Sequence, residues 1–431
     1  MPPALTSTLA AAADSASLDR SLAILGAMLV LGALISGLAK RSFLSVAAVF
    51  VVTGFVLGDG GLEILAFDPG SGFVATLAVV ALILILFRDG LEVEAEMLQK
   101  AWRLPLRKLL LAMPITAAVV ACTTKALTDL SWTESFLLGA LLSPTDPVLS
   151  SGVVTNPRVP RLIRHSLNLE SGMNDGLALP AVLALTAALA TGVDDFVWWQ
   201  FVLQDVTLGI ITGLIVGYGA SLLMPRSRSL GHAISSHQKA LYGLGVAFAT
   251  YGIAVLQPQG NGFIAVFVCA ITLGIRRPDI RRCFERRSED VIELVKLGVF
   301  VVFGSLLTLD GLFGDDWTAV GIAAVTLLLA RPVAIFVSLV GTRTDTATKA
   351  FMAWFGPKGV ATMTFALIVL AEGLAAGERI FNIAALTVFC SILVHGVTDT
   401  PGSEWMARRA ERLGLDAPPA ASPVPVAGTV P

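Results

Sequence analysis

Two apolar stretches of this 431-residue chain each contain a short polar run with carboxylates. The longer run holds four polar residues within six positions: Glu170, Ser171, Asn174 and Asp175. On a helix, Ser171 and Asp175 share a face, as do Glu170 and Asn174, because residues four apart are neighbours. One face therefore offers a carboxylate and a hydroxyl to an ion, and the adjacent face can hold a partner cation.

The other polar run is Ser143-Pro144-Thr145-Asp146-Pro147, in which two prolines flank Thr145 and Asp146. Each proline removes an amide donor and crowds the preceding turn, so the stretch cannot be an unbroken helix. Within a membrane, irregular backbone is tolerated only where it is buried in protein or lines a watery cavity. We expect Thr145 and Asp146 to lie at an unwound segment whose free carbonyl groups suit a cation.

A basic residue occurs in a second interrupted stretch, Gly356-Pro357-Lys358-Gly359. We expect Lys358 to be the cation that pairs with the acids of the longer run, with snorkelling to the membrane surface as the alternative. Two other polar residues in apolar stretches, Arg331 and His395, are expected to make structural pairs or caps rather than to bind the ion.

The composition places these residues in a membrane. Hydrophobic residues make up 55% of the chain and charged residues 14%, whereas ordinary globular proteins carry roughly 25% charged residues. The mean hydropathy is +0.79. The net charge of −2 gives no indication of a nucleic-acid partner, and four scattered cysteines match no metal site or disulfide framework.

A membrane-spanning helix needs about 20 mostly apolar residues, and thirteen stretches approach this pattern. They lie near 21–38, 43–58, 72–87, 106–124, 135–153, 166–190, 201–224, 239–257, 261–275, 291–309, 317–341, 350–371 and 380–398. The sequence thus predicts an all-α polytopic membrane protein with residues 1–400 as the transmembrane domain. Residues 401–431 are expected to form a short cytoplasmic tail that is disordered from about 417, and no cleaved signal peptide is expected at the start.

Basic residues predict the orientation of these spans. With the N-terminus outside, most of the 30 basic residues fall in cytoplasmic segments, and the outer segments contain only Arg20, Lys125 and Arg379. Cytoplasmic loops carry the lysine and arginine excess in membrane proteins. The pattern therefore predicts a multi-pass protein of the cell membrane with its N-terminus outside and its C-terminus in the cytoplasm.

The two interrupted stretches are the fifth and twelfth spans. Their offset of seven inverts the topology, so we expect spans 1–6 and 8–13 to form two inverted repeats in which the broken fifth and twelfth helices cross. Broken helices at matching positions of two inverted halves indicate the midplane site of a transporter.

At these residues the chain resembles the monovalent cation:proton antiporters of the NhaP type, the branch that includes the animal sodium/proton exchangers. The similar motifs are Thr145-Asp146-Pro147, the run from Glu170 to Gly176, Leu86-Phe87-Arg88-Asp89-Gly90-Leu91-Glu92, Arg331-Pro332 and Gly356-Pro357-Lys358-Gly359. The resemblance implies a thirteen-helix inverted-repeat fold and a homodimer. It also implies interleaved core and dimerisation subdomains that move relative to each other by an elevator mechanism.

The resemblance also assigns roles to residues. Asp175 matches the carboxylate shared by cation and proton, Thr145 and Ser171 match ion-coordinating positions, and Asp146 lies close to the ion. Glu170 matches an acid that pairs with a basic residue of the twelfth helix. Asn174 marks the branch regarded as electroneutral. The family usually has Arg where this chain has Lys358, and the electrogenic branch uses Lys, so the stoichiometry stays open.

The predicted function is exchange of a monovalent cation for protons, with pH homeostasis as its role. Na⁺ is the expected cation, and K⁺ and Li⁺ are the alternatives. Cation and proton compete for Asp175, and only a neutralised site crosses the low-dielectric barrier. We expect no enzyme activity, since no protease motif is found, and no resident cofactor. The alternative is a passive cation channel or an ion-sensing protein on a transporter scaffold.

Overall fold

The computed structural model describes most of the chain that follows the first predicted span. The described residues are 46–93, 103–146, 153–154, 156–225, 234–256, 260–314 and 317–414, together with positions 23, 26 and 30. The first predicted span apart from those three positions, Pro147 and the tail from 417 are not among the described residues. Within them the chain is mainly helical and contains no strand.

Helices occupy the positions of the second to seventh predicted spans. They are α2 (Val46–Leu57), α3 (Gly72–Glu92), α5 (Arg103–Arg107), η1 (Lys108–Ala112), α6 (Met113–Leu127), α7 (Trp132–Leu141), α9 (Arg161–Thr191), α10 (Trp198–Gln200), η3 (Phe201–Val206) and α11 (Thr207–Leu223). The segments η1 and η3 are π-helical and continue directly into α6 and α11.

Helices also occupy the positions of the remaining predicted spans. They are α12 (Ser236–Leu256), α13 (Gly262–Arg276), α14 (Pro278–Arg287), α15 (Glu289–Ser305), α16 (Leu309–Phe313), α17 (Trp317–Val325), η4 (Thr326–Ala330), α18 (Arg331–Ser338), α19 (Thr346–Trp354), α20 (Val360–Ala371) and α21 (Gly377–Leu413). The last helix extends beyond the predicted span, through Pro401.

Seven helical segments of the described chain are long and apolar enough to cross a membrane. Shorter apolar helices lie at Ala47–Leu57, Gly262–Arg276 and Val360–Ala371. The chain is therefore a multi-pass helical membrane protein, and the number of thirteen spans and their inverted repetition stay predictions.

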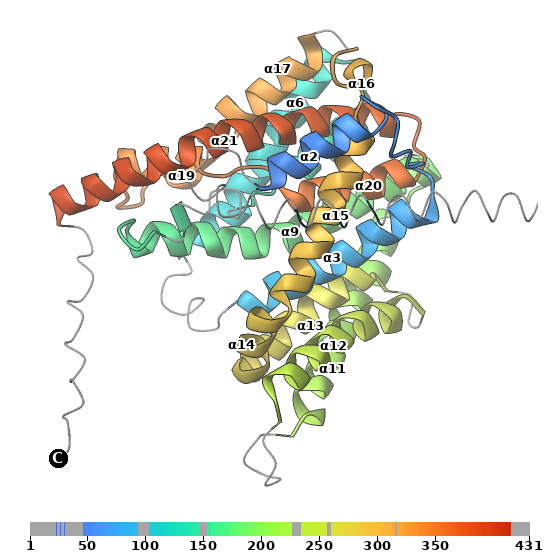
Figure 1. The fold of residues 1–431 in the computed structure, drawn as a ribbon, viewed down its shortest axis with the longest axis vertical. Helices are drawn as coiled ribbons and strands as arrows, with labels where there is room; N and C mark the ends of the chain where they lie inside the picture. The colour runs from blue at the N-terminus through green and yellow to red at the C-terminus, as the bar shows by residue number, and fades with distance from the viewer. Residues whose placement is uncertain are drawn as a thin grey trace, which may run out of the picture.

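The helices are arranged so that α3, α9, α15 and α20 lie in the middle of the molecule. In Figure 1, α11 to α14 gather at one end and α6, α16 and α17 at the other. Contacts of α3 with α9 and α20, and of α15 with α20, join the two ends. The centre of the molecule is thus made by helices from both halves of the chain.

Close packing of α11 against α13 depends on three glycines spaced four residues apart. A Cβ atom at Gly209, Gly213 or Gly217 would lie 2.5 to 2.9 Å from a backbone carbonyl oxygen of α13 or of Asn261, which precedes it. Small residues at such spacing let helix backbones approach closely, which is how membrane helices gain packing energy. The pair α11 and α13 is consequently a tightly fitted unit at one end of the molecule.

Candidate ion-binding site

The predicted break in the fifth span is present and touches the break in the twelfth. Helix α7 ends at Leu141, and residues 142–146 are not helical. The amide of Asp146 donates to the carbonyl oxygen of Pro357 at 2.8 Å, and the amide of Val360 donates to Oδ2 of Asp146 at 3.3 Å. The second break spans residues 355–359, between α19 and α20. The two unwound segments therefore hold each other by backbone and carboxylate contacts.

Lys358 lies at this contact with its side chain inside the protein. It is 1% exposed, and Nζ donates to the carbonyl oxygens of Pro144 at 3.0 Å and Ser143 at 3.3 Å. The alternative in which Lys358 snorkels to the surface is therefore wrong. The carbonyl groups of the first break do bind a cation, as their geometry suggested, but in this structure that cation is the ammonium group of Lys358.

The acids of α9 face the same region. Nδ2 of Asn174 donates to Oγ1 of Thr145 at 2.9 Å and to its carbonyl oxygen at 3.0 Å. The next residue, Asp175, is buried, and its Oδ1 has no hydrogen-bond partner in the part of the chain that the structure describes. Ser171 is also buried and lies one turn before Asp175. Asn174 thus fixes Thr145 beside a carboxylate that has an oxygen available.

Glu170 does not pair with Lys358, and that expectation is wrong. Its carboxylate accepts from Nη1 of Arg331 at 2.8 Å, from Nη2 at 3.3 Å and from Nζ of Lys108 at 2.5 Å. All three side chains are buried. Arg331 was rightly expected to make a structural pair, and a forked guanidinium satisfies both carboxylate oxygens better than a point charge does. Lys358 is left free to bind the carbonyl groups of the first break.

Both cations that bind Glu170 lie beside π-helical segments. Lys108 is the first residue of η1, and Arg331 directly follows η4. Short π-helical turns occur mostly inside α-helices and often at functional sites, because the extra residue shifts the face on which later side chains lie. The two segments belong to the predicted fourth and eleventh spans, which are seven apart, like the two broken spans.

Sequence reasoning missed a further acid near Asp175. Asp89 is 3% exposed and accepts two hydrogen bonds from Arg88, at 2.7 and 2.9 Å. The charged side chains that interact electrostatically with Asp175 include Asp89, Asp146, Arg88 and Lys358. The sequence placed Asp89 just beyond a span that was expected to end at residue 87, whereas α3 continues to Glu92.

Two glycines allow the close contacts at the second break. A Cβ atom at Gly359 would lie 2.3 Å from Oδ2 of Asp146, and one at Gly356 would lie 1.9 Å from Nε of Arg331. Neither contact is sterically possible, so any side chain at these positions would displace its neighbour. The Gly-Pro-Lys-Gly sequence therefore joins the two buried charge clusters through four residues of backbone.

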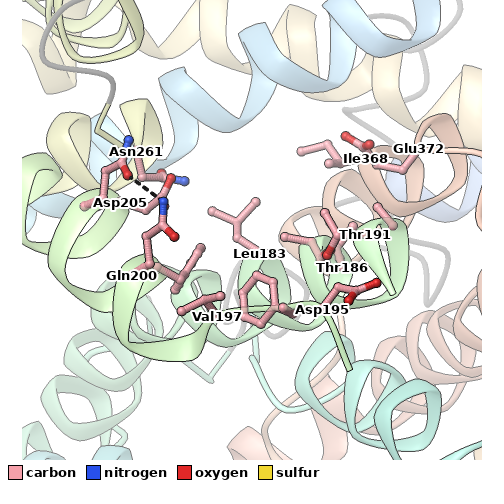
Figure 2. A pocket seen from close by; sticks show the side chains of 15 residues that line it. Leu183, Thr186, Thr191, Asp195, Val197, Gln200, Asp205, Asn261, Ile368 and Glu372 are labelled. Carbon is pink, nitrogen blue, oxygen red and sulfur yellow. Dashed lines mark hydrogen bonds between the residues drawn. The ribbon is translucent and has the colours of Figure 1, made fainter. Parts of the chain in front are cut away.

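Two cavities lie along α9 on opposite sides of Asp175. The smaller, about 160 Å³, is lined by α9 residues up to Gly172 and by Glu92, Arg281 and Glu285. The larger, about 610 Å³, begins at Leu183. Figure 2 shows Asp205 and Gln200 on one side of the larger cavity and Glu372 and Ile368 on the other. At a rise of 1.5 Å per residue, Asp175 lies about 4.5 Å along the helix from Gly172 and about 12 Å from Leu183.

The sequence and the fold of this chain match a known family of membrane transport proteins. A family model described as "Sodium/hydrogen exchanger, transmembrane" matches residues 27–405. The chain therefore belongs to the sodium/hydrogen exchanger family, which confirms the resemblance noted in the sequence. The structure of the sodium proton antiporter MjNhaP1 from Methanocaldococcus jannaschii has the same fold, with a TM-score of 0.77 and 20% identity over 91% of this chain and 99% of that one.

Curated relatives include proteins named for two different cations. The K(+)/H(+) antiporter NhaP of Alkalimonas amylolytica is 25% identical over 90% of this chain and 67% of its own length. The K(+)/H(+) antiporter NhaP2 of Shewanella sp. (strain ANA-3) is 25% identical over 88% of this chain and 65% of its own. The Na(+)/H(+) antiporter NhaG of Bacillus atrophaeus is 26% identical over 90% and 74%. The chain spans about two thirds of the length of the first two relatives.

Proposed function

We propose that this protein exchanges a monovalent cation for protons across the cell membrane, with Asp175 as the group for which the two compete. The observation that carries the proposal is the buried carboxylate of Asp175, with one oxygen unpartnered within the described chain, beside two broken helices. Asp146, Thr145 and Ser171 supply further carboxylate and hydroxyl oxygens, which are the ligand types that hard cations prefer. A proton or a cation can neutralise Asp175, and that requirement couples the two fluxes.

The two cavities support alternating access to this group. Asp175 lies between them along α9, nearer to the cavity at Gly172, which faces the cytoplasm in the predicted orientation. We propose that this arrangement corresponds to an inward-facing state, and that movement of α9 and α20 relative to α11 and α13 opens the site to the larger cavity instead. The proposal includes the homodimer and the elevator motion that the family resemblance implies.

The contacts of Lys358 favour one-for-one exchange. A lysine bonded to Asp175 would release its own proton when a cation arrives, which would add a second proton to the cycle. Within the described residues, Nζ of Lys358 instead donates to two backbone carbonyl oxygens. We propose Na⁺ as the principal cation with K⁺ and Li⁺ as alternatives, a cycle without a resident cofactor or enzyme activity, and a role in pH homeostasis.

The test is cation/proton exchange by purified protein in proteoliposomes carrying an internal pH dye, with Na⁺, K⁺ and Li⁺ added separately and the membrane potential clamped or free. We expect exchange with at least one cation, no dependence on imposed voltage, and its loss in Asp175→Asn. The control is Asp195→Asn, an exposed acid of the larger cavity. Undiminished exchange in Asp175→Asn would refute the site, and channel-like currents would refute the antiport.

A further inference from the structure

His395 connects the two sides of the break in the twelfth span. Its Nε2 lies 2.9 Å from the carbonyl oxygen of Trp354, the last residue of α19. On the other side of the break, the amide of Lys358 donates to Oγ of Ser391 at 2.8 Å. Ser391 and His395 are one turn apart on α21, and both are buried. A single turn of α21 thus binds the backbone before and after the unwound segment.

The serine hydroxyl and the imidazole are also in contact with each other. Oγ of Ser391 lies 3.2 Å from Nδ1 of His395. A hydroxyl accepts and donates at once, and a neutral imidazole donates from one nitrogen and accepts at the other. Nδ1 also lies 2.8 Å from the carbonyl oxygen of Ser391, which only accepts, so a proton on Nδ1 donates to this carbonyl and towards Oγ of Ser391. The same Oγ accepts the Lys358 amide, so the imidazole, the hydroxyl and that amide form one hydrogen-bonded chain.

We propose that His395 is a positioning residue for ion exchange, which acts through Ser391 to hold the unwound segment that carries Lys358. The inference rests on the proposed function, because it assigns a transport role to the break. The ring contacts both sides of the break, because Nδ1 is on the Ser391 side and Nε2 lies 2.9 Å from the carbonyl oxygen of Trp354.

The surroundings of the ring agree with a positioning role. The charged side chains that act on it from the neighbouring elements are Arg331 of α18 and Lys358 of the break, both of which are cations. On its own helix, Asp399 accepts a hydrogen bond from the amide of Val153. The indole of Trp354 lies 5.5 Å from the imidazole between ring centroids. The contacts of His395 are therefore with the backbone of Trp354 and with Ser391, at the break.

The consequence for transport follows from what Lys358 holds. Its ammonium group binds the carbonyl groups of Ser143 and Pro144, and the adjacent Pro357 carbonyl accepts the amide of Asp146. Loss of the Ser391 hydroxyl leaves the buried Lys358 amide without its acceptor, and loss of the imidazole removes the contact that holds this hydroxyl in place. Leaving a buried donor unpaired costs about as much as one hydrogen bond, which corresponds to roughly tenfold in an equilibrium. We expect a rise in KM for the cation of this size, with a smaller change in the maximal rate.

The experiment compares His395→Ala, Ser391→Ala, the double variant and His395→Gln, whose side-chain amide can donate and accept in place of the ring. Exchange in proteoliposomes gives KM and maximal rate. Hydrogen–deuterium exchange of residues 353–362 in detergent reports directly on the Lys358 amide, whether or not transport is observed. The matched control is Thr398→Val, a change on the same helix, α21, as Ser391 and His395. It removes the acceptor of the 2.9 Å hydrogen bond from Nε1 of Trp354 and leaves the contacts of Ser391 and His395 unchanged.

Both alanine variants are expected to raise KM and to speed amide exchange at the break by about tenfold. The double variant should be no worse than either, because residues of one hydrogen-bonded chain are not additive. Gln should restore both readouts to within about threefold, and Thr398→Val should resemble wild type. Unchanged amide exchange in His395→Ala, or strictly additive effects in the double variant, would overturn the inference. If the wild-type protein showed no cation/proton exchange, only the proposed function would be refuted. The hydrogen–deuterium exchange of the amides would still decide whether His395 positions the break.

Discussion

Glu170 pairs with two buried cations, Lys108 and Arg331. We therefore expect that removing Lys108 restores part of the stability that is lost when the Glu170 carboxylate is removed. Glu170→Gln leaves both Lys108 and Arg331 as buried charges without a carboxylate partner. Removing one member of a buried ion pair costs roughly 3–5 kcal/mol. Lys108 keeps a bond to the Ser166 carbonyl oxygen, and Arg331 keeps one to that of Met352, so we expect a loss within this range.

Lys108→Met should be much milder, because the forked pair between Glu170 and Arg331 remains. The loss is that of one hydrogen bond to a charged group, about 1.5–3 kcal/mol. In the double variant Glu170→Gln/Lys108→Met, only one uncompensated cation is left. We therefore expect the double variant to be more stable than Glu170→Gln alone, although it carries one mutation more.

The assay is thermal unfolding of the purified protein in detergent, followed by tryptophan fluorescence and by the fraction that elutes as a single species after heating. Glu372→Gln, which changes an exposed acid at the end of α20, serves as the control. A double variant that melts below Glu170→Gln would show that the pairing of charges does not determine stability here, and the reasoning would be refuted.

Three further predictions follow from contacts at the site and at its edge. Gly359→Ala should lower cation/proton exchange by about a hundredfold, because the new Cβ atom would collide with Asp146 and a displacement of about 1 Å at a reacting group has an effect of this size. In the control Gly219→Ala, the new Cβ atom meets nothing within 4 Å, and exchange in the same dye assay should be unchanged. Asp89→Asn removes a buried negative charge near the site and should raise KM for the cation several-fold with the protein still folded, whereas an unchanged KM would exclude Asp89 from the site. Hydrogen bonds from Arg277 and Lys239 hold the pKa of Asp279 well below its usual range, so the stabilising effect of Asp279 is complete above a pH of about 4 and is lost as the pH falls further. Asp279→Asn should therefore lower the melting temperature at pH 7 and should have no such effect in strong acid. An equal difference in melting temperature at both pH values would contradict this prediction.

Sequence reasoning located the breaks because closely spaced prolines and glycines disfavour a helix, whereas the single prolines Pro180 and Pro401 lie inside helices. Pro144 and the Gly356-Pro357-Lys358-Gly359 sequence mark unwound backbone independently of what packs against it. A helix occupies each predicted position from residue 43 onward, since an apolar run of sufficient length has few alternatives. These features are local, and local features can be predicted from the chain alone.

The pairing of buried charges could not be predicted in the same way. Lys108 follows Arg107 at the start of a span, where basic residues commonly reach the membrane surface, and only the neighbouring helices determine that its side chain turns inward. Lys358 was the expected partner of Glu170, whereas Arg331 is the observed one, and the choice depends on which helix packs against α9 at that depth. Asp89 was overlooked because the extension of α3 beyond residue 87 buries it.

The four residues from Gly356 to Gly359 connect the ion pairs of Glu170 to the contact between the two broken helices. Arg331 lies against one end of this stretch and Asp146 against the other. Under the proposed function, we expect a movement of Asp146 on ion binding either to bend this short backbone or to shift the guanidinium group of Arg331, which pairs with Glu170. We therefore expect the occupancy of the proposed ion site and the stability of the Glu170 ion-pair cluster to depend on the position of the same segment. Measured separately, as cation affinity and as heat stability, they should rise and fall together across variants of this stretch.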